Sequence, residues 1–148
     1  MNPTPASNTP NIFSWPIRVY WEDTDAGGIV FYANYLKYFE RARTEWLRAL
    51  GLEQRHLQST LGCIFVVSEA RIKYLRPARL DDQLLVTAQL SEMGRSSFTI
   101  LQEAHLLAQT SDGASQLLCA GSVRIGWVDH RTMKPARIPQ TIHDALKR

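Results

Sequence analysis

Features that often reveal a protein's class at a glance are scarce in this chain of 148 residues. It has two cysteines, Cys63 and Cys119, which lie too far apart for a CxxC pair or a metal-binding spacing and which we expect to be buried free thiols. No apolar run approaches the roughly 18 residues that a membrane-spanning helix needs. Because the N-terminus also lacks a basic segment followed by an apolar one, the sequence predicts no secretory signal and a cytoplasmic location.

Charge and histidine content argue against nucleic acids and metals. The net charge is +3, which is too small to indicate nucleic-acid binding, although it suits a small anionic ligand. The four histidines stand at no metal-like spacing from one another, and the chain has no GxSxG, HExxH, P-loop or GxGxxG motif. The sequence therefore predicts no metal site, no cofactor and no nucleic-acid partner.

The length, with 45% hydrophobic and 21% charged residues, is typical of one soluble globular domain. Residues 1–14 are rich in Pro, Asn, Ser and Thr, so we expect a disordered tail before a single domain over residues 15–148. Apolar residues recur at spacings of three and four over residues 32–50, which predicts one amphipathic helix of about five turns. Shorter helices are expected over residues 53–61 and after Pro139.

Alternating apolar and polar residues predict strands in the rest of the chain. Residues 16–22 are expected to form a short first strand, and four longer runs follow between residues 63 and 128, separated by turn sequences. In the first of these runs, one face is expected to hold Ile64, Val66, Ala70, Ile72 and Tyr74. Short connections favour antiparallel neighbours, and only the long helix offers a large apolar stripe to cover the sheet. The sequence thus predicts an α+β fold with a five-stranded antiparallel sheet wrapped around one long central helix, and dimerisation through an exposed sheet edge.

A basic segment, ARIKYLRPAR, carries four positive side chains within nine residues: Arg71, Lys73, Arg76 and Arg79. One interpretation is a solvated strand face with the acidic residues that follow as ion-pair partners. The other is phosphate binding, for which Arg and Lys side chains are well suited. The sequence leaves both interpretations open.

The most unusual stretch is VYWEDTDAGGIVFYANYLKYFERART, residues 19–44, which begins like a strand and ends like a helix. At the junction stand Asp23 and Asp25, followed by Gly27 and Gly28. Two structural interpretations are a solvated turn and a helix cap, because Asp and Gly favour turns and a carboxylate before a helix satisfies free N–H groups. A calcium loop is excluded, because its twelfth position carries Asn rather than Glu. A phosphatase-type DxD nucleophile would need the other parts of a larger doubly wound fold.

A catalytic interpretation accounts for more of this stretch. Glycines let the backbone turn tightly and approach a ligand. The free N–H groups at the start of the following helix, backed by its dipole, would stabilise a developing oxyanion. A carboxylate held beside them can attack a carbonyl or activate a water. These parts suffice for acyl transfer to water, and a thioester suits them because its leaving group needs little assistance.

The order strand, EDTDAGGIVFYANYLKYFERARTEWL, strand resembles the hotdog-fold thioesterases. Within them it is similar to the 4-hydroxybenzoyl-CoA thioesterase family, and most of all to the YbgC-type acyl-CoA thioesterases linked to the Tol–Pal system. The resemblance runs from about residue 17 to residue 130 and includes YLRPARLDD; its most specific part is D-x-D-x-x-G-x-V followed by aromatic residues and the long helix. YbgC-type proteins often carry His where this chain has Tyr32, whereas the hydroxybenzoyl branch has Tyr, and a backbone role survives that exchange.

The resemblance implies the strand order 1-3-4-5-2 and a homo-oligomer, either a dimer or a dimer of dimers (a homotetramer), with active sites at the subunit interface. It implies that Asp25 is the catalytic nucleophile or general base, that the backbone N–H of Tyr32 binds the oxyanion, and that Asp23 has a structural role. Further substrate contacts are expected, the last three of them with the CoA phosphates, from Gly27, Gly28, Val30, Arg71, Lys73 and Arg76.

The expected function is therefore hydrolysis of an acyl-CoA thioester to the free acid and CoA, with acyl carrier protein as a further candidate partner. The alternative is a non-catalytic module that binds acyl thioesters or acyl carrier protein, with at most a peripheral association with the inner membrane. A metal- or phosphate-using DxD enzyme is a third hypothesis, which predicts that a chelator abolishes activity. The sequence leaves the acyl group open between short aliphatic, long aliphatic and aromatic chains.

Overall fold

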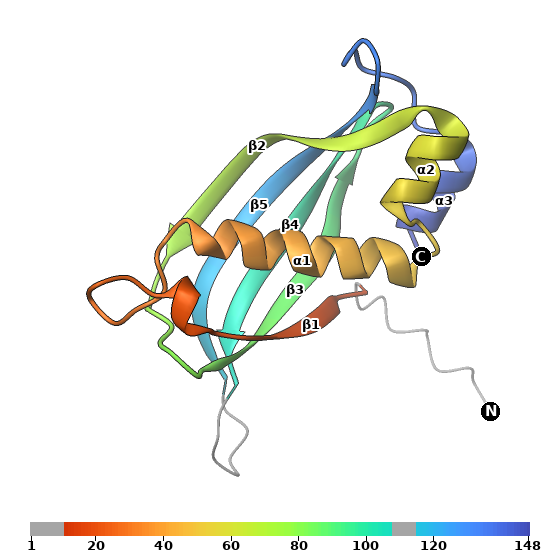
Figure 1. Ribbon diagram of the computed structural model, residues 1–148. Coiled ribbons are helices and arrows are strands. Elements are labelled where there is room, and N and C mark those ends of the chain that lie inside the picture. Colours follow the sequence, from red (N-terminus) through yellow and green to blue (C-terminus); the bar gives the residue numbers. More distant parts are fainter. Residues whose placement is uncertain (1–10, 108–114) are drawn as a thin grey trace, which may run out of the picture.

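The computed structural model describes residues 11–107 and 115–148 of the chain. Figure 1 shows its elements, which in chain order are β1 (Phe13–Arg18), the 3₁₀ turn η1 (Trp21–Asp23), α1 (Asn34–Ala49), α2 (Gln54–Leu61), β2 (Cys63–Tyr74), β3 (Gln83–Met93), β4 (Ser97–Leu106), β5 (Gln116–Asp129) and α3 (Gln140–Leu146).

One antiparallel sheet of five strands forms the body of the protein, in the order β1-β3-β4-β5-β2. The sheet curves around α1, and α2 and α3 lie together beyond the C-terminal end of that helix (Figure 1). The predicted α+β hotdog fold and its strand order are confirmed. Within the described residues β2 pairs only with β5, so the other edge of this strand has no neighbour.

Helix α1 packs onto the sheet through one apolar stripe, made of Tyr35, Tyr38, Phe39, Ala42, Trp46 and Leu47. Burial of each large side chain in the stripe contributes on the order of 2 kcal/mol to folding. The stripe lies mainly against β1, β3 and β4. Leu36 of α1 and Val67 of β2 remain 43% and 51% exposed and line a groove between the helix and β2. The helix therefore leaves the β2 side of the sheet uncovered.

A buried side-chain amide also joins α1 to the sheet. Gln102 of β4 is fully buried, and its Nε2 donates to the carbonyls of Phe39 in α1 (3.0 Å) and Thr87 in β3 (3.2 Å). Its Oε1 accepts a hydrogen bond from Nη1 of Arg43 at 3.0 Å. Both ends of the amide are thus satisfied, as a buried polar group requires, and the contact fixes the helix at its middle.

The apolar face predicted for the β2 run is wrong at its N-terminal end. The register shifts at Ser68, which has no partner on β5. Because alternation depends on register, this bulge moves the preceding residues to the opposite face of the sheet. Ile64 and Val66 therefore do not share the α1 side with the later apolar residues. Phe65 lies there instead, and its ring contacts that of Trp127 at a centroid distance of 4.7 Å.

The first strand begins and ends earlier than predicted, at Phe13–Arg18 rather than residues 16–22. Residues 13 and 14, the end of the predicted tail, pair with β3, whereas residues 1–10 lie outside the described part of the chain. The chain leaves the sheet after Arg18 because η1 follows, closed by a hydrogen bond from the Tyr20 N–H to the Asp23 carboxylate at 2.8 Å.

The three helices lie where the sequence predicts them, and α2 ends at Gly62 in the left-handed conformation, with φ +67°. Both cysteines are free thiols; Cys119 is buried and Cys63 is half-buried. In the part of the chain that the structure describes, no helix combines the length and apolar character needed to cross a membrane.

Candidate functional site

Residues 24–30 form a tight loop between η1 and α1, and we call it the Asp25 loop (Figure 1). Thr24 and Val30 pair at its base. The Asp25 N–H donates to the Ile29 carbonyl at 2.9 Å, and the Gly28 N–H donates to the Asp25 carbonyl at 3.0 Å. Asp25 itself is exposed. The loop thus holds a solvent-accessible carboxylate on a hydrogen-bonded backbone.

Two glycines shape this loop. Gly28 has φ +78°, a left-handed conformation that strongly favours glycine. The Gly27 N–H donates to Oδ1 of Asp25 at 2.8 Å, and a Cβ added at Gly27 would stand 3.2 Å from the same oxygen. A side chain at position 27 would therefore crowd the carboxylate. The N–H groups of both glycines are engaged inside the loop, so they orient Asp25 rather than face a ligand.

Asp23 holds the loop from inside the protein. It is 6% exposed, and its carboxylate accepts the Tyr20 N–H in η1. Its carbonyl accepts the Phe31 N–H at 2.9 Å and Nδ2 of Asn34 at 2.8 Å, which ties η1 to the start of α1. This geometry supports the structural role predicted for Asp23. The reactive role of Asp25 stays a prediction.

The start of α1 offers free backbone donors next to the loop. The Phe31 N–H is bonded to Asp23, and the Asn34 N–H donates to the Phe31 carbonyl at 2.8 Å. Between them, the N–H groups of Tyr32 and Ala33 donate to no acceptor among residues 11–107 and 115–148. The positive end of the helix dipole lies behind these two groups. The turn therefore has the donors that an oxyanion needs, at the position predicted for Tyr32.

A mostly apolar pocket of about 270 Å³ opens beside this turn. It is lined by Ile29, Val30, Tyr32, Tyr35, Tyr74, Leu75, Arg76 and Pro77. Val30 is buried and its N–H is bonded to the Ala78 carbonyl, so it contributes a pocket wall rather than a donor. Aromatic walls with one cation suit a ligand that joins an apolar part to an anionic part.

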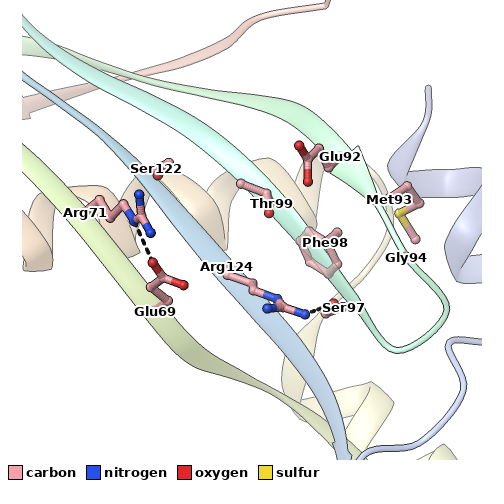
Figure 2. Close-up of a pocket in the computed structure, with 10 residues that line it drawn as sticks. All are labelled: Glu69, Arg71, Glu92, Met93, Gly94, Ser97, Phe98, Thr99, Ser122 and Arg124. Carbon is pink, nitrogen blue, oxygen red and sulfur yellow. Dashed lines mark hydrogen bonds and ion pairs between the residues drawn. The ribbon is translucent and has the colours of Figure 1, made fainter.

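Arg71 lies in a different place. It lines a groove of about 570 Å³ over β2, β3, β4 and β5. Its Nε pairs with Oε1 of Glu69 at 2.6 Å, and Figure 2 shows both side chains in this groove, with α1 behind the strands. This groove shares no residue with the pocket beside Tyr32. Lys73 and Arg76 are exposed, and neither makes an ion pair within the described residues. Of the three predicted phosphate contacts, the structure brings only Arg76 to the pocket.

Side chains for other chemistries do not gather in the described ranges 11–107 and 115–148. No three His, Cys, Asp or Glu residues there lie close enough together to hold a metal ion. Burial raises the pKa of Cys119 to about 12, so its thiol is protonated and unreactive at neutral pH.

Three neighbours of the turn were not predicted from the sequence: Asn34, Tyr35 and Tyr74. Asn34 anchors Asp23, and the Tyr35 hydroxyl accepts the Ala78 N–H at 3.0 Å. The Tyr74 hydroxyl donates to the Tyr32 carbonyl at 2.9 Å. The last two contacts join residues more than forty positions apart, and the only sequence signal was the excess of tyrosine around the motif.

The chain matches the family described as the thioesterase-like superfamily over residues 19–146. Acyl-CoA thioesterase YbgC of Haemophilus influenzae is 43% identical over 136 residues, which cover 92% of this chain and 95% of that protein. Acyl-CoA thioester hydrolase YbgC of Escherichia coli O6:H1 is 38% identical over 131 residues, covering 88% and 92%. A 4-hydroxybenzoyl-CoA thioesterase variant solved with 4-hydroxybenzoyl-CoA superposes with a TM-score of 0.83 over 91% of this chain and 98% of that one. At 19% identity this last similarity supports the fold alone.

Proposed function

Because this chain belongs to the thioesterase-like superfamily, we propose that it hydrolyses acyl-CoA thioesters to the free acid and CoA at the Asp25 loop. The observation that carries the assignment to this loop is the pairing of an oriented, exposed carboxylate with two free N–H groups at the adjoining helix start. Nucleophile or base plus oxyanion donors is the minimal set for acyl transfer to water.

Two routes use the same atoms. In one, an Asp25 oxygen attacks the thioester carbonyl carbon, the C–S bond breaks, CoA leaves as the thiolate, and water hydrolyses the resulting mixed anhydride. In the other, Asp25 takes a proton from a water molecule that attacks the carbonyl directly. In both, negative charge develops on the carbonyl oxygen, and the free N–H groups of Tyr32 and Ala33 stabilise it.

A thiol-release assay over short aliphatic, long aliphatic and aromatic acyl-CoAs tests the function. We expect at least one class to be cleaved with catalytic turnover and the rate to be unchanged by a chelator, because the chemistry needs only the carboxylate and backbone donors. Acyl-CoA that binds without being cleaved would favour the non-catalytic binding module. Activity lost with the chelator would favour a metal-dependent DxD enzyme.

Arg76 is the residue we propose for a CoA phosphate, because it is exposed at the pocket beside Tyr32 and free of ion pairs in the described structure. Arg76→Gln should raise the KM for acyl-CoA about three- to tenfold, through loss of one charge-assisted contact, and leave kcat nearly unchanged. Arg71→Gln is the matched control, since Arg71 is paired with Glu69 in the other groove. Equal effects of the two substitutions would contradict the assignment.

We propose that the active form is a homo-oligomer in a cytoplasmic location. The open edge of β2 and the exposed apolar side chains beside it, Leu36 and Val67, support pairing with a second copy, because an uncovered strand edge with apolar neighbours favours association. Light scattering on the purified protein should give the mass of at least two chains. An active monomer would contradict the proposal.

A further inference from the structure

Tyr74, the last residue of β2, contacts the turn at Tyr32 and Ala33 that carries the free N–H groups. Its hydroxyl donates to the Tyr32 carbonyl at 2.9 Å, across 42 positions of sequence. Since α1 begins at Asn34, this carbonyl precedes the helix, and in the described part of the chain its only hydrogen bond comes from Tyr74. A side chain on the sheet therefore holds the turn that carries the free N–H groups.

The two free N–H groups are each backed by a hydrogen-bonded carbonyl. The Tyr32 N–H belongs to the peptide unit whose carbonyl, on Phe31, accepts the Asn34 N–H at 2.8 Å. The Ala33 N–H belongs to the next peptide unit, whose carbonyl is the one that Tyr74 holds. A hydrogen bond at the carbonyl end of a peptide polarises its N–H end. The backbone supplies this support for one donor, and Tyr74 supplies it for the other.

We propose that Tyr74 is a positioning residue for thioester hydrolysis, and that its hydroxyl orients and polarises the Tyr32–Ala33 peptide so that the turn binds the oxyanion. This inference rests on the function proposed above. Tyr74 touches no reacting atom in this scheme and acts through the backbone that does.

Two ring contacts hold the tyrosine, which is otherwise 45% exposed. Its ring stands edge-to-face against those of Tyr32 (centroids 6.0 Å apart, 87°) and Tyr35 (5.5 Å, 64°). Burial against these neighbours raises the pKa of Tyr74 above its ordinary value, with Cys119 and Tyr32 as further causes. The hydroxyl therefore keeps its proton, and its ability to donate, through the neutral and mildly alkaline range.

Tyr74→Phe removes the hydroxyl and keeps the ring, so it isolates the hydrogen bond. Because the bond supports transition-state charge rather than substrate binding, kcat should fall about tenfold while KM stays within about twofold. Tyr20→Phe is the matched control: Tyr20 is 61% exposed and its hydroxyl makes no hydrogen bond within the described residues, so kcat should not change. Equal kcat values for the wild type and Tyr74→Phe would overturn the proposal.

The infrared carbonyl band of bound acyl-CoA shows whether Tyr74 positions the oxyanion donors or only stabilises the fold. Acyl-CoA labelled with ¹³C at the thioester carbonyl is bound to the Asp25→Asn protein, which should not cleave it, and the infrared carbonyl band is recorded. We expect the band to lie below that of free acyl-CoA and to move back toward it in the Asp25→Asn, Tyr74→Phe double variant. A lower melting temperature with an unmoved band would overturn the proposal in favour of a purely structural role. Failure of the wild type to cleave any acyl-CoA would instead refute the proposed function.

Discussion

Replacing Asp25 with Asn should lower kcat for thioester hydrolysis by about a thousandfold or more while the protein stays folded and oligomeric. A carboxamide is neither a nucleophile nor a base at neutral pH, so both routes fail. The fold should be unaffected, because Asn retains an oxygen that can accept the Gly27 N–H, the contact that Oδ1 of Asp25 makes at 2.8 Å. Thiol release, thermal unfolding and light scattering on the same preparation check these expectations.

Asp23→Asn is the control for this experiment. Asp23 is buried and bonded to Tyr20 and to the start of α1. Asp23→Asn should therefore lower the melting temperature, with a loss of kcat below about tenfold, since it weakens a charge-assisted hydrogen bond rather than removing a reacting group. Full activity in both Asp25→Asn and Asp25→Ala would refute the assignment of Asp25. A complete loss of activity in Asp23→Asn with normal stability would mean that Asp23, rather than Asp25, is the reacting carboxylate.

The division between the two aspartates shows what the sequence could reveal about the site. The D-x-D-x-x-G pattern at a strand-to-helix junction predicted a turn, free helix N–H groups and one reactive carboxylate, because all three depend on residues within a few positions of each other. The burial of Asp23 and the exposure of Asp25 depend on the path of η1, which the sequence pattern read as part of a strand. The contacts of Tyr35 and Tyr74 cross the fold, so no local spacing could indicate them.

In the sheet, too, features that depend on local sequence could be predicted, and features that depend on contacts across the fold could not. Five alternating runs and one apolar helix stripe were enough to predict the layers, because only one arrangement covers the apolar face. The strand order came from the family resemblance, since alternation says nothing about which strands are neighbours. The face of Ile64 and Val66 was mispredicted because a bulge at Ser68 depends on the register with β5. Gln102 was missed because a buried polar residue in a strand looks the same in sequence as an exposed one until its partners, Phe39 and Arg43, are in place.

Among the glycines of the described residues, Gly121 leaves the least room for a Cβ, so Gly121→Ala should be strongly destabilising. Gly121 lies in β5 opposite Ile72, at the place where Phe39 of α1 packs on the sheet. A Cβ there would stand 2.6 Å from the carbonyl oxygen of Arg71 and 3.3 Å from the Phe39 ring. The closer contact is with backbone, so a strand must move, and we expect a loss of about 3 kcal/mol in the free energy of unfolding.

The same strand supplies the control for this experiment. Gly126 also lies in β5, and a Cβ there would meet only the Val66 side chain at 3.6 Å and its carbonyl at 3.8 Å, which are ordinary contacts. Gly126→Ala should change the free energy of unfolding by less than about 1 kcal/mol. Urea unfolding at matched protein concentration measures both, because association shifts apparent stability. Equal stability of the two variants would mean that β2 and α1 can move away from β5 at no cost in free energy. That result would contradict the tight packing of Phe39 over Gly121. This packing sets the position of α1, and with it the position of the turn at Tyr32.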